Sequence, residues 1–351
     1  MSISPHSLVI DLHCHAAGIG AGASGCYVNP RLLRSYKFGF YLRAFGVTRR
    51  ELAESGDTLV LDRIAAGIAA STAVDRAVVL ALDGGVDAHG RLDTERTEFL
   101  VPDAFVADGA ARHPELLFGA SIHPRRRDAL ERLDHAHERG AVLLKWLPAI
   151  QDFDPADRRL IPFYRRLAQL GLPLLTHTGP EHSFTRARDE VSDPERLRLP
   201  LSEGVTVIAA HAATCGAYEG EPGPKRLARL MRTYPTLYAD LSALTLANRI
   251  GQLPALLATP EFDGRLLFGT DYPLIAMRAL SSPWPALFRL GFRTTRTLAA
   301  ISNPWDRDVA LNRALGVGHD ILESSAVLLG LPPVTGVRAR HQTTAGLRPS
   351  T

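Results

Sequence analysis

The stretch VIDLHCH, residues 9–15, is an apolar run that ends in two histidines separated by one residue. In a β-strand successive side chains point to opposite faces, so we expect His13 and His15 to share a face while Cys14 points away into the core. Asp11 would lie on the histidine face, deeper along the strand, where it would hydrogen-bond a ligand. Two neutral imidazoles on one face could hold a cation, but they could equally be core histidines satisfied by hydrogen bonds.

Seven further apolar runs of strand length follow along the chain. The eight strand candidates are residues 8–13, 76–82, 116–122, 141–147, 172–178, 205–211, 236–242 and 265–271. Most are apolar along their whole length, which is typical of parallel strands buried on both faces. These runs therefore predict a parallel sheet that is buried on both faces, as the apolar run at the start of the chain suggests.

Segments with helical spacing separate these runs, and we expect helices at 60–73, 101–112, 126–139, 155–170, 224–233 and 253–259. The clearest is DPADRRLIPFYRRLAQLG (154–171), in which Asp154 would cap the helix, Pro155 would lie in the first turn and Gly171 would end it. Eight strand–helix units favour an α/β fold of the closed (β/α)8 type, a TIM barrel. An open doubly wound sheet is the alternative.

The connection after the first strand, residues 16–58, is too long for a simple turn and is rich in basic and aromatic residues. Long loops at the C-terminal ends of barrel strands usually serve the active site, so we expect an insertion that acts as a lid. An oligomer contact or a membrane-surface contact is the alternative. We expect one domain over residues 1–331, a distorted barrel, and a disordered tail over 332–351.

The composition of the 351 residues is that of a globular protein, with a net charge of +3 spread along the chain. This pattern does not indicate nucleic-acid binding. The three cysteines, Cys14, Cys26 and Cys215, form no CxxC pair, which argues against a disulfide framework and suits a reducing cytosol. Neither a signal peptide nor a transmembrane run is recognisable. We expect a cytoplasmic protein without a membrane or nucleic-acid partner; it could be a homodimer.

Ionisable residues recur at the C-terminal ends of the strand candidates. They are His13 and His15 on the first strand, Lys145 on the fourth, His177 on the fifth, His211 on the sixth and Asp271 on the eighth. Barrel geometry brings these ends together at one mouth. Buried ionisable groups must be paired or bind metal, so the pattern predicts a metal centre.

This pattern resembles the amidohydrolase superfamily, over residues 8–316. The segments LLKWLPAIQDFDP (143–155), LGLPLLTHTG (170–179), FGTDYP (268–273) and NPWDRDVALNRALG (303–316) are similar to its amidohydrolase-related, aminocarboxymuconate-semialdehyde-decarboxylase-like branch. The resemblance implies one or two divalent cations, with His13, His15, His177 and Asp271 as ligands. It makes His211 a proton donor or acceptor in one-metal members and a ligand in two-metal members.

Lys145 has two interpretations under this resemblance. In two-metal relatives the matching lysine is carboxylated and bridges the cations, which requires a neutral amine of depressed pKa. As a plain ammonium it would instead hold a substrate carboxylate. The branch favours one metal, whereas the ligand set permits two. We expect Zn²⁺, with Mn²⁺ as the alternative.

Five other residues are predicted to contact a small-molecule substrate: Glu181, His182, His123, Arg125 and Asp240. Each has a structural alternative, such as an exposed loop, a solvated helix entrance or a cap. With Asp271 and His211 as catalytic residues, the sequence predicts a metal-dependent hydrolase of an amide, ester or lactone. A non-oxidative decarboxylase of an aromatic or unsaturated acid is the alternative, and a binding barrel without turnover is a third hypothesis.

Overall fold

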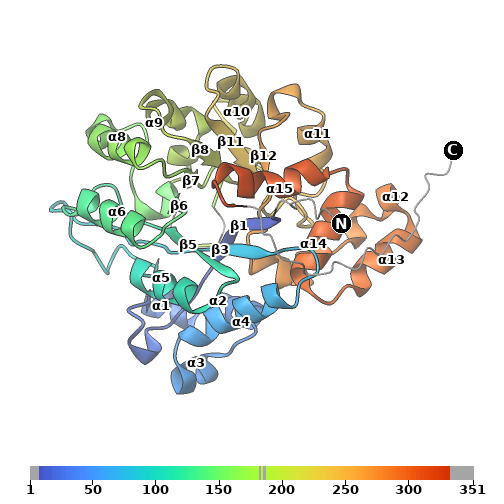
Figure 1. Cartoon of the computed structure of the whole chain (residues 1–351), viewed down its shortest axis with the longest axis horizontal. Helices are drawn as coiled ribbons and strands as arrows, with labels where there is room; N and C mark the ends of the chain where they lie inside the picture. Colours follow the sequence, from blue (N-terminus) through green and yellow to red (C-terminus); the bar gives the residue numbers. More distant parts are fainter. Residues whose placement is uncertain (1–7, 182, 185–186, 333–351) are drawn as a thin grey trace.

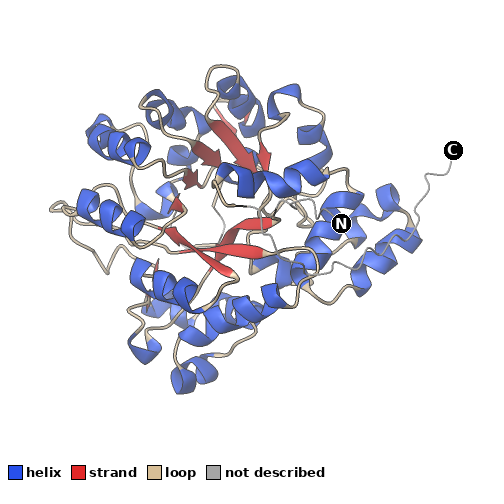
Figure 2. Cartoon of the chain, in the orientation of Figure 1, coloured by secondary structure: helices blue, strands red, loops and turns tan. Residues whose placement is uncertain are grey.

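The computed structural model describes residues 8–181, 183–184 and 187–332. Eight parallel strands form one sheet in chain order, with the helices around it (Figures 1 and 2). The strands are β1 (Ile10–His15), β3 (Arg76–Leu80), β5 (Leu116–Ala120), β6 (Leu143–Trp146), β7 (Leu174–Thr176), β8 (Val207–Ala209), β11 (Leu237–Asp240) and β12 (Leu266–Leu267). All eight strand predictions are confirmed, each within its predicted run or a few residues of it.

The chain after β12 returns alongside β1 and joins the two edges of the curled sheet. The backbone N–H of Leu12 donates to Phe268 O at 3.2 Å, and that of Asp271 donates to His13 O at 2.9 Å. Cys14 and Tyr272 form a parallel bridge. These bonds pair backbone groups of the two edge strands, as closure of a barrel requires. The fold is therefore the predicted (β/α)8 barrel rather than an open sheet.

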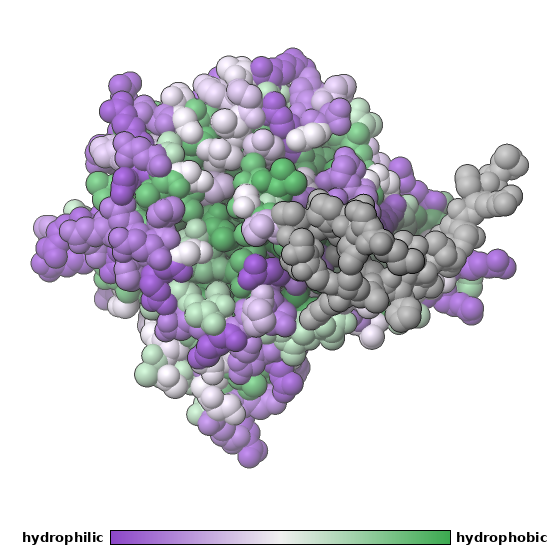
Figure 3. Space-filling model, viewed as in Figure 1, coloured by the Kyte–Doolittle hydropathy of each residue, from purple (hydrophilic) through white to green (hydrophobic). Residues whose placement is uncertain are grey.

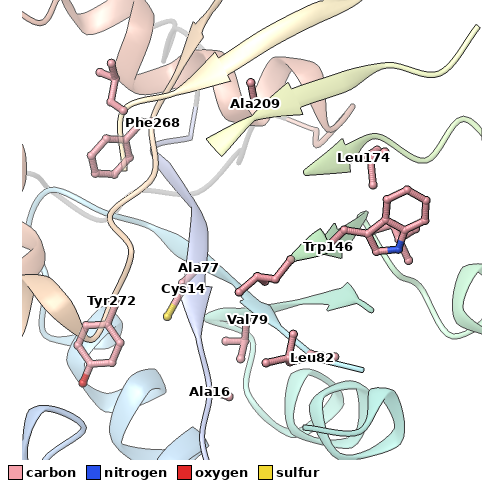
Figure 4. Close-up of a cluster of buried hydrophobic side chains, with 14 of the residues drawn as sticks. Cys14, Ala16, Ala77, Val79, Leu82, Trp146, Leu174, Ala209, Phe268 and Tyr272 are labelled. Atoms are coloured by element: carbon pink, nitrogen blue, oxygen red, sulfur yellow. The ribbon is translucent and has the colours of Figure 1, made fainter. Parts of the chain in front are cut away.

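The barrel interior is filled by aliphatic side chains, and the layer between strands and helices forms a second core. Interior residues include Ile10, Leu12, Leu143, Leu175 and Ile208. Figure 4 shows part of the outer layer, where Cys14 lies near Ala77 and Val79. Cys14 is fully buried there, as predicted. On the face seen in Figure 3, hydrophobic residues gather toward the middle and hydrophilic ones toward the periphery.

An irregularity in β1 changes the predicted face of Asp11. The pairing of β1 with β3 shifts between Asp11 and Cys14, where β1 has one extra residue. Such a bulge re-aims side chains, and here Leu12 lies in the barrel interior although His13 also faces the site. Asp11 instead accepts hydrogen bonds from Thr270 Oγ1 at 2.6 Å and Trp305 Nε1 at 2.9 Å. The prediction that Asp11 shares the face of His13 is wrong.

The predicted helices are present with shifted ends: α4 (Thr58–Ala69), α5 (Asp103–Arg112), α6 (Ala129–Glu138), α8 (Ile161–Gln169), α10 (Gly223–Met231) and α11 (Leu253–Leu257). α8 begins later than predicted because Asp154 caps a separate turn through the N–H of Ala156. Asp157 then caps a short 3₁₀ turn. Shorter helices are α7 (Pro148–Gln151), α9 (Arg198–Ser202) and α12 (Leu287–Leu290), and α13 (Phe292–Ala300), α14 (Pro304–Ala314) and α15 (His319–Leu328) follow the barrel.

The 16–58 insertion forms a short strand and three helices: β2 (Tyr27–Val28), α1 (Pro30–Arg34), α2 (Tyr36–Ala44) and α3 (Arg49–Ser55). β2 pairs with β4 (Phe99–Leu100) from the next long connection. The end of α2 lies against the segment after β12, since Tyr272 Oη donates to Ala44 O at 3.2 Å. The insertion therefore lies beside the mouth of the barrel, where a lid would have to be.

None of the helices in the described ranges is long and apolar enough to cross a membrane. Of the predicted tail, only residue 332 lies within the described residues.

Candidate metal centre

Three ligand atoms from the two joined edges of the barrel converge on one point. His13 Nε2 lies 3.2 Å from His15 Nε2, and His15 Nε2 lies 3.1 Å from Asp271 Oδ1. The third separation, His13 Nε2 to Asp271 Oδ1, is 3.7 Å. Two imidazoles and a carboxylate are ligands that suit a divalent transition metal. The strand ends thus form the candidate metal site that their order in the sequence predicts.

Asp240 fixes the tautomer of His13 through the ring nitrogen that does not face the other candidate ligands. His13 Nδ1 lies 2.7 Å from Asp240 Oδ2, and a carboxylate can only accept, so Nδ1 carries the proton. The lone pair of Nε2 then faces the site, as in the carboxylate–histidine–metal arrangement of known metalloenzymes. Burial, together with the Lys145 ammonium, lowers the pKa of His13 to about 4. His13 is therefore a neutral imidazole at neutral pH, the form that binds metal.

His211 is held in the same tautomer. Its Nδ1 lies 3.1 Å from the carbonyl oxygen of Ser242, which can only accept a hydrogen bond, so Nδ1 carries the proton. Its backbone N–H donates to Asp240 Oδ1 at 2.7 Å. Burial lowers the pKa of His211 well below its ordinary value. His211 therefore presents a neutral Nε2, and its ring stacks on that of His13 at 5.1 Å between centroids.

His177, beside His211, has an unsatisfied nitrogen. Its Nδ1 lies 3.6 Å from Glu181 Oε2, whereas its Nε2 is buried and has no hydrogen-bond partner within the described ranges. Its ring centroid lies 5.1 Å from that of His211. Buried polar atoms are normally paired, so an orphaned imidazole nitrogen beside other ligands fits a bound cation. The donor set therefore suits a metal on the chemistry of its own residues.

Lys145 reaches into this cluster from β6. It is 1% exposed, and its Nζ lies 2.8 Å from His13 Nε2. Burial lowers the pKa of Lys145 to about 8, although the carboxylates of Asp240, Asp271 and Glu181 oppose the shift. Since a cation would need the same lone pair of His13, Lys145 must release Nε2 when metal binds.

The backbone around two of these residues is unusual. His211 has φ 58° and Asp271 has φ 62°, in the left-handed region that non-glycine residues rarely occupy. Such strain is found where a site holds a side chain in a required direction. Close to them, a Cβ on Gly269 would lie 2.9 Å from His13 Cβ. The FGTDYP segment needs glycine at this position because the two strands approach so closely.

Asp271 remains ionised in this environment. Burial would raise its pKa, but the hydrogen bond from His15 and the charges of His211 and His13 hold it well below its usual range. Burial likewise opposes ionisation of Asp240, and His13 more than compensates, so its pKa is lowered. Asp271 and Asp240 are thus both anionic, the first among the candidate ligand atoms and the second behind His13.

The predicted substrate contacts are placed differently from one another. Glu181 lies at the site beside His177. Asp240 is fully buried and bonds His13 and His211, so it positions ligands and is not available to a substrate. His123 is also fully buried, since its Nε2 donates to Gln151 O at 2.9 Å and its Nδ1 accepts from the Arg125 N–H. Its ring nitrogens therefore bond backbone groups, one at the end of α7 and one in the loop of His123 itself.

Arg125 is exposed, and its charge lowers the pKa of Asp157 and contributes to the lowered pKa of His123. His182 lies outside the described residues.

Three residues at the site were not predicted from the sequence. Ser242 donates through Oγ to Asp240 Oδ1, and it also lies 2.8 Å from His211 Nδ1. Tyr41 on α2 is close enough for Asp271 and Glu181 to raise its pKa, although burial is the larger cause. Burial is the main reason why the pKa values of His177 and His211 are lowered, and the positive charge of Arg249 lowers them further. The only sequence signal for Ser242 was its place two residues after Asp240.

A closed (β/α)8 barrel with imidazoles and a carboxylate at its strand ends defines a class of metal-dependent enzymes. The amidohydrolase family model matches residues 10–299, so the chain belongs to this family, which confirms the resemblance seen in the sequence. It is an enzyme of the amidohydrolase superfamily.

Solved structures of low sequence identity share the fold. An uncharacterized TIM-barrel protein from Bordetella bronchiseptica is 18% identical with a TM-score of 0.51, over 88% of this chain and 99% of that chain. The 2,6-dihydroxybenzoate decarboxylase from Rhizobium is 13% identical with a TM-score of 0.53, over 93% and 99%. Metarhizium anisopliae IDCase is 12% identical with a TM-score of 0.50, over 94% and 99%. Comparison with curated proteins finds no match.

Proposed function

We propose that this chain is a metal-dependent hydrolase that cleaves an amide, ester or lactone bond of a small molecule. The observation that carries the proposal is the convergence of His13 Nε2, His15 Nε2 and Asp271 Oδ1 within 3.7 Å of one another. Each of the three atoms can offer a lone pair to a cation, His15 when its proton is on Nδ1.

The residues that would hold the cation are His13, His15, His177 and Asp271, and Zn²⁺ suits this set best. When bound, the cation polarises a substrate carbonyl and lowers the pKa of a water molecule toward neutrality. Asp271 is an ionised carboxylate at the same point, so it accepts the proton of the attacking water and returns it to the leaving group. His211 presents a neutral Nε2 from the opposite side.

Lys145 completes the arrangement in one of two ways. As an ammonium it withdraws from His13 and pairs with Asp271 or Glu181, or with a substrate carboxylate. As a neutral amine, which a pKa of about 8 makes accessible near neutral pH, it reacts with carbon dioxide and becomes an anionic ligand for a second cation. We propose the first state for the one-metal enzyme.

Decarboxylation of a small aromatic or unsaturated acid is the second candidate. A fully buried lysine that faces the ligand atoms favours an anionic substrate, and the alternative shares the entire metal site. The two reactions differ in whether water or a proton is added at the reacting carbon.

The test is a screen of the zinc-loaded protein against esters, lactones, amides and carboxylic acids in ¹⁸O-labelled water. Hydrolysis places ¹⁸O in the product acid, whereas decarboxylation releases carbon dioxide and leaves no ¹⁸O in the remaining product. His211→Asn should abolish turnover and keep the metal. Protein that binds metal yet turns over neither class, with His211→Asn still binding the same ligands, would contradict the proposal and favour a binding barrel.

A further inference from the structure

The loop after β11, residues 241–252, lies between the two segments that carry His211 and Asp271. On one side the N–H of Leu241 donates to Leu267 O at 3.0 Å, and that of Ala247 donates to Leu280 O at 2.9 Å. On the other side Gln252 Nε2 donates to Cys215 Sγ at 3.0 Å, four residues beyond His211. The loop is therefore tied to both walls of the mouth.

Arg249 on this loop has buried N–H groups without acceptors. Its Nε and Nη1 atoms are buried, and neither has a hydrogen-bond partner among the residues that the structure describes. Arg226 and Arg126 differ in this respect, since they bond Asp193 and Asp83. Arg307 also has a buried Nε without a partner in the described ranges, but both of its Nη atoms donate to backbone carbonyls of Ile301 and Ile275. Leaving charged donors buried and unpaired costs free energy, so the arrangement indicates a partner that comes from outside the chain.

This guanidinium is close enough to two candidate ligand imidazoles to act on them electrostatically. Its charge depresses the pKa of both His177 and His211, after the larger effect of burial. The carboxylates of the site have other partners, since Glu181 faces His177, Asp271 faces His15 and Asp240 faces His13. Within the described ranges none of them forms an ion pair with Arg249.

We propose that Arg249 binds a carboxylate of the substrate, so that the substrate is a small organic acid. The carboxylate accepts charge-assisted hydrogen bonds from Nε and Nη1, and the bond to be cleaved is then held over the ligand atoms of the metal centre. This inference rests on the proposed function, because it assumes that the substrate reacts at this centre.

The experiment measures binding of benzoate and of neutral benzamide by calorimetry, with zinc-loaded and metal-free protein. Arg249→Gln and Arg249→Lys are compared with Arg232→Gln, which removes an exposed arginine paired with Glu261. Circular dichroism and melting temperature verify that each variant is folded. We expect the wild type and Arg232→Gln to bind benzoate at least about tenfold more tightly than benzamide, Arg249→Gln to lose this preference, and Arg249→Lys to retain part of it.

Equal benzoate binding by wild type and Arg249→Gln would overturn the proposal, as would benzoate binding no tighter than benzamide binding in the wild type. Loss of benzoate binding with metal removal, unaffected by Arg249→Gln, would show that the carboxylate binds the metal and would also overturn it. If the protein proves inert as a hydrolase while its benzoate preference depends on Arg249, the proposed function fails, but the assignment of Arg249 as a carboxylate-binding residue stands.

For a substrate acid found by the screen, Arg249→Gln should raise KM at least about tenfold and change kcat less. A neutral ester of the same acid should show no such difference.

Discussion

The two sides of the metal centre differ in how completely their polar atoms are paired. On the side of β1 and β11, His13, Asp240, Ser242 and the backbone of His211 form a closed network of hydrogen bonds. On the side of β7 and Arg249, His177 Nε2 and two N–H groups of Arg249 are buried without partners in the described part of the chain. The saturated side orients the candidate ligands, and the unsaturated side has buried nitrogen atoms that the proposed cation and substrate would bind.

The largest effect should come from the unsaturated side. His177→Asn removes an imidazole nitrogen that bonds nothing else in the described chain, so metal binding and turnover should fall while stability changes little. If the metal no longer stabilises the transition state by several kcal/mol, kcat/KM should fall by about 10³-fold. Metal analysis, kinetics and thermal melting measure the three quantities.

His319→Asn is the matched control, since His319 is exposed and faces Glu323 on α15. Full activity in His177→Asn would contradict the assignment of its Nε2 to a cation.

Breaking the saturated side should weaken metal binding less and stability more. Asp240→Asn removes the anion that fixes the tautomer of His13, which should lower metal affinity by about 10–100-fold. The same change disturbs several buried hydrogen bonds and should cost roughly 1–3 kcal/mol of unfolding free energy. A chelator competition assay and denaturant unfolding test both effects.

Asp263→Asn, an exposed position on the loop before β12, serves as the control and should match the wild type. An unchanged metal affinity in Asp240→Asn would mean that the tautomer of His13 does not depend on this carboxylate.

A smaller loss of metal affinity is expected where only the spacing between β1 and the segment after β12 changes. Gly269→Ala adds a Cβ 2.9 Å from His13 Cβ, so the strand ends must separate by some tenths of an ångström. We expect metal affinity to fall by about tenfold because ligand geometry is exacting. The affinity is measured as before, with Gly39→Ala as control, since a Cβ at that helical glycine meets no atom within 4 Å. Undiminished affinity would show that the site tolerates this displacement.

The smallest functional effect should come from Asp308, whose buried carboxyl group lies on α14. Burial raises the pKa of Asp308 to about 7, and Thr245 and Asn312 bond it. Between pH about 4 and 7 the unfolded chain ionises this group while the folded chain keeps it protonated, so the wild type loses stability as pH rises through this window. Asp308→Asn removes that loss.

The variant should therefore gain on the wild type by up to a few kcal/mol between pH 4 and pH 7, with unchanged metal content. Denaturant unfolding at both pH values measures the difference. A constant difference at all pH values would show that Asp308 does not titrate in this range.

The sequence predicted the fold well because its signals are local. Eight apolar runs predict the strands, and the ionisable residues at their ends are the candidate ligands, independently of the connections between them. It failed for Asp11, since one extra residue in β1 reverses the faces without changing the apolar pattern. Faces in a strand depend on pairing register, which a single strand does not encode.

The sequence did not indicate the partners that individual side chains have in the fold. Asp240 and His123 were predicted to contact substrate, yet each bonds groups 28 or more residues away in the chain, Asp240 to His13 and His123 to Gln151. Arg249 was missed because it lies in a loop without periodicity, and its significance comes from what it does not bond. Satisfied and unsatisfied polar groups are properties of tertiary structure.

Metal content is the most direct test of the account. Purified protein should be stripped by chelator, reloaded with Zn²⁺ and analysed by mass spectrometry for metal per chain, alongside His15→Ala and Asp271→Asn. We predict about one equivalent in the wild type and little in either variant, because each variant loses one of the converging ligand atoms. Reloaded wild-type protein that holds no metal, or variants that hold as much as the wild type, would contradict the central claim.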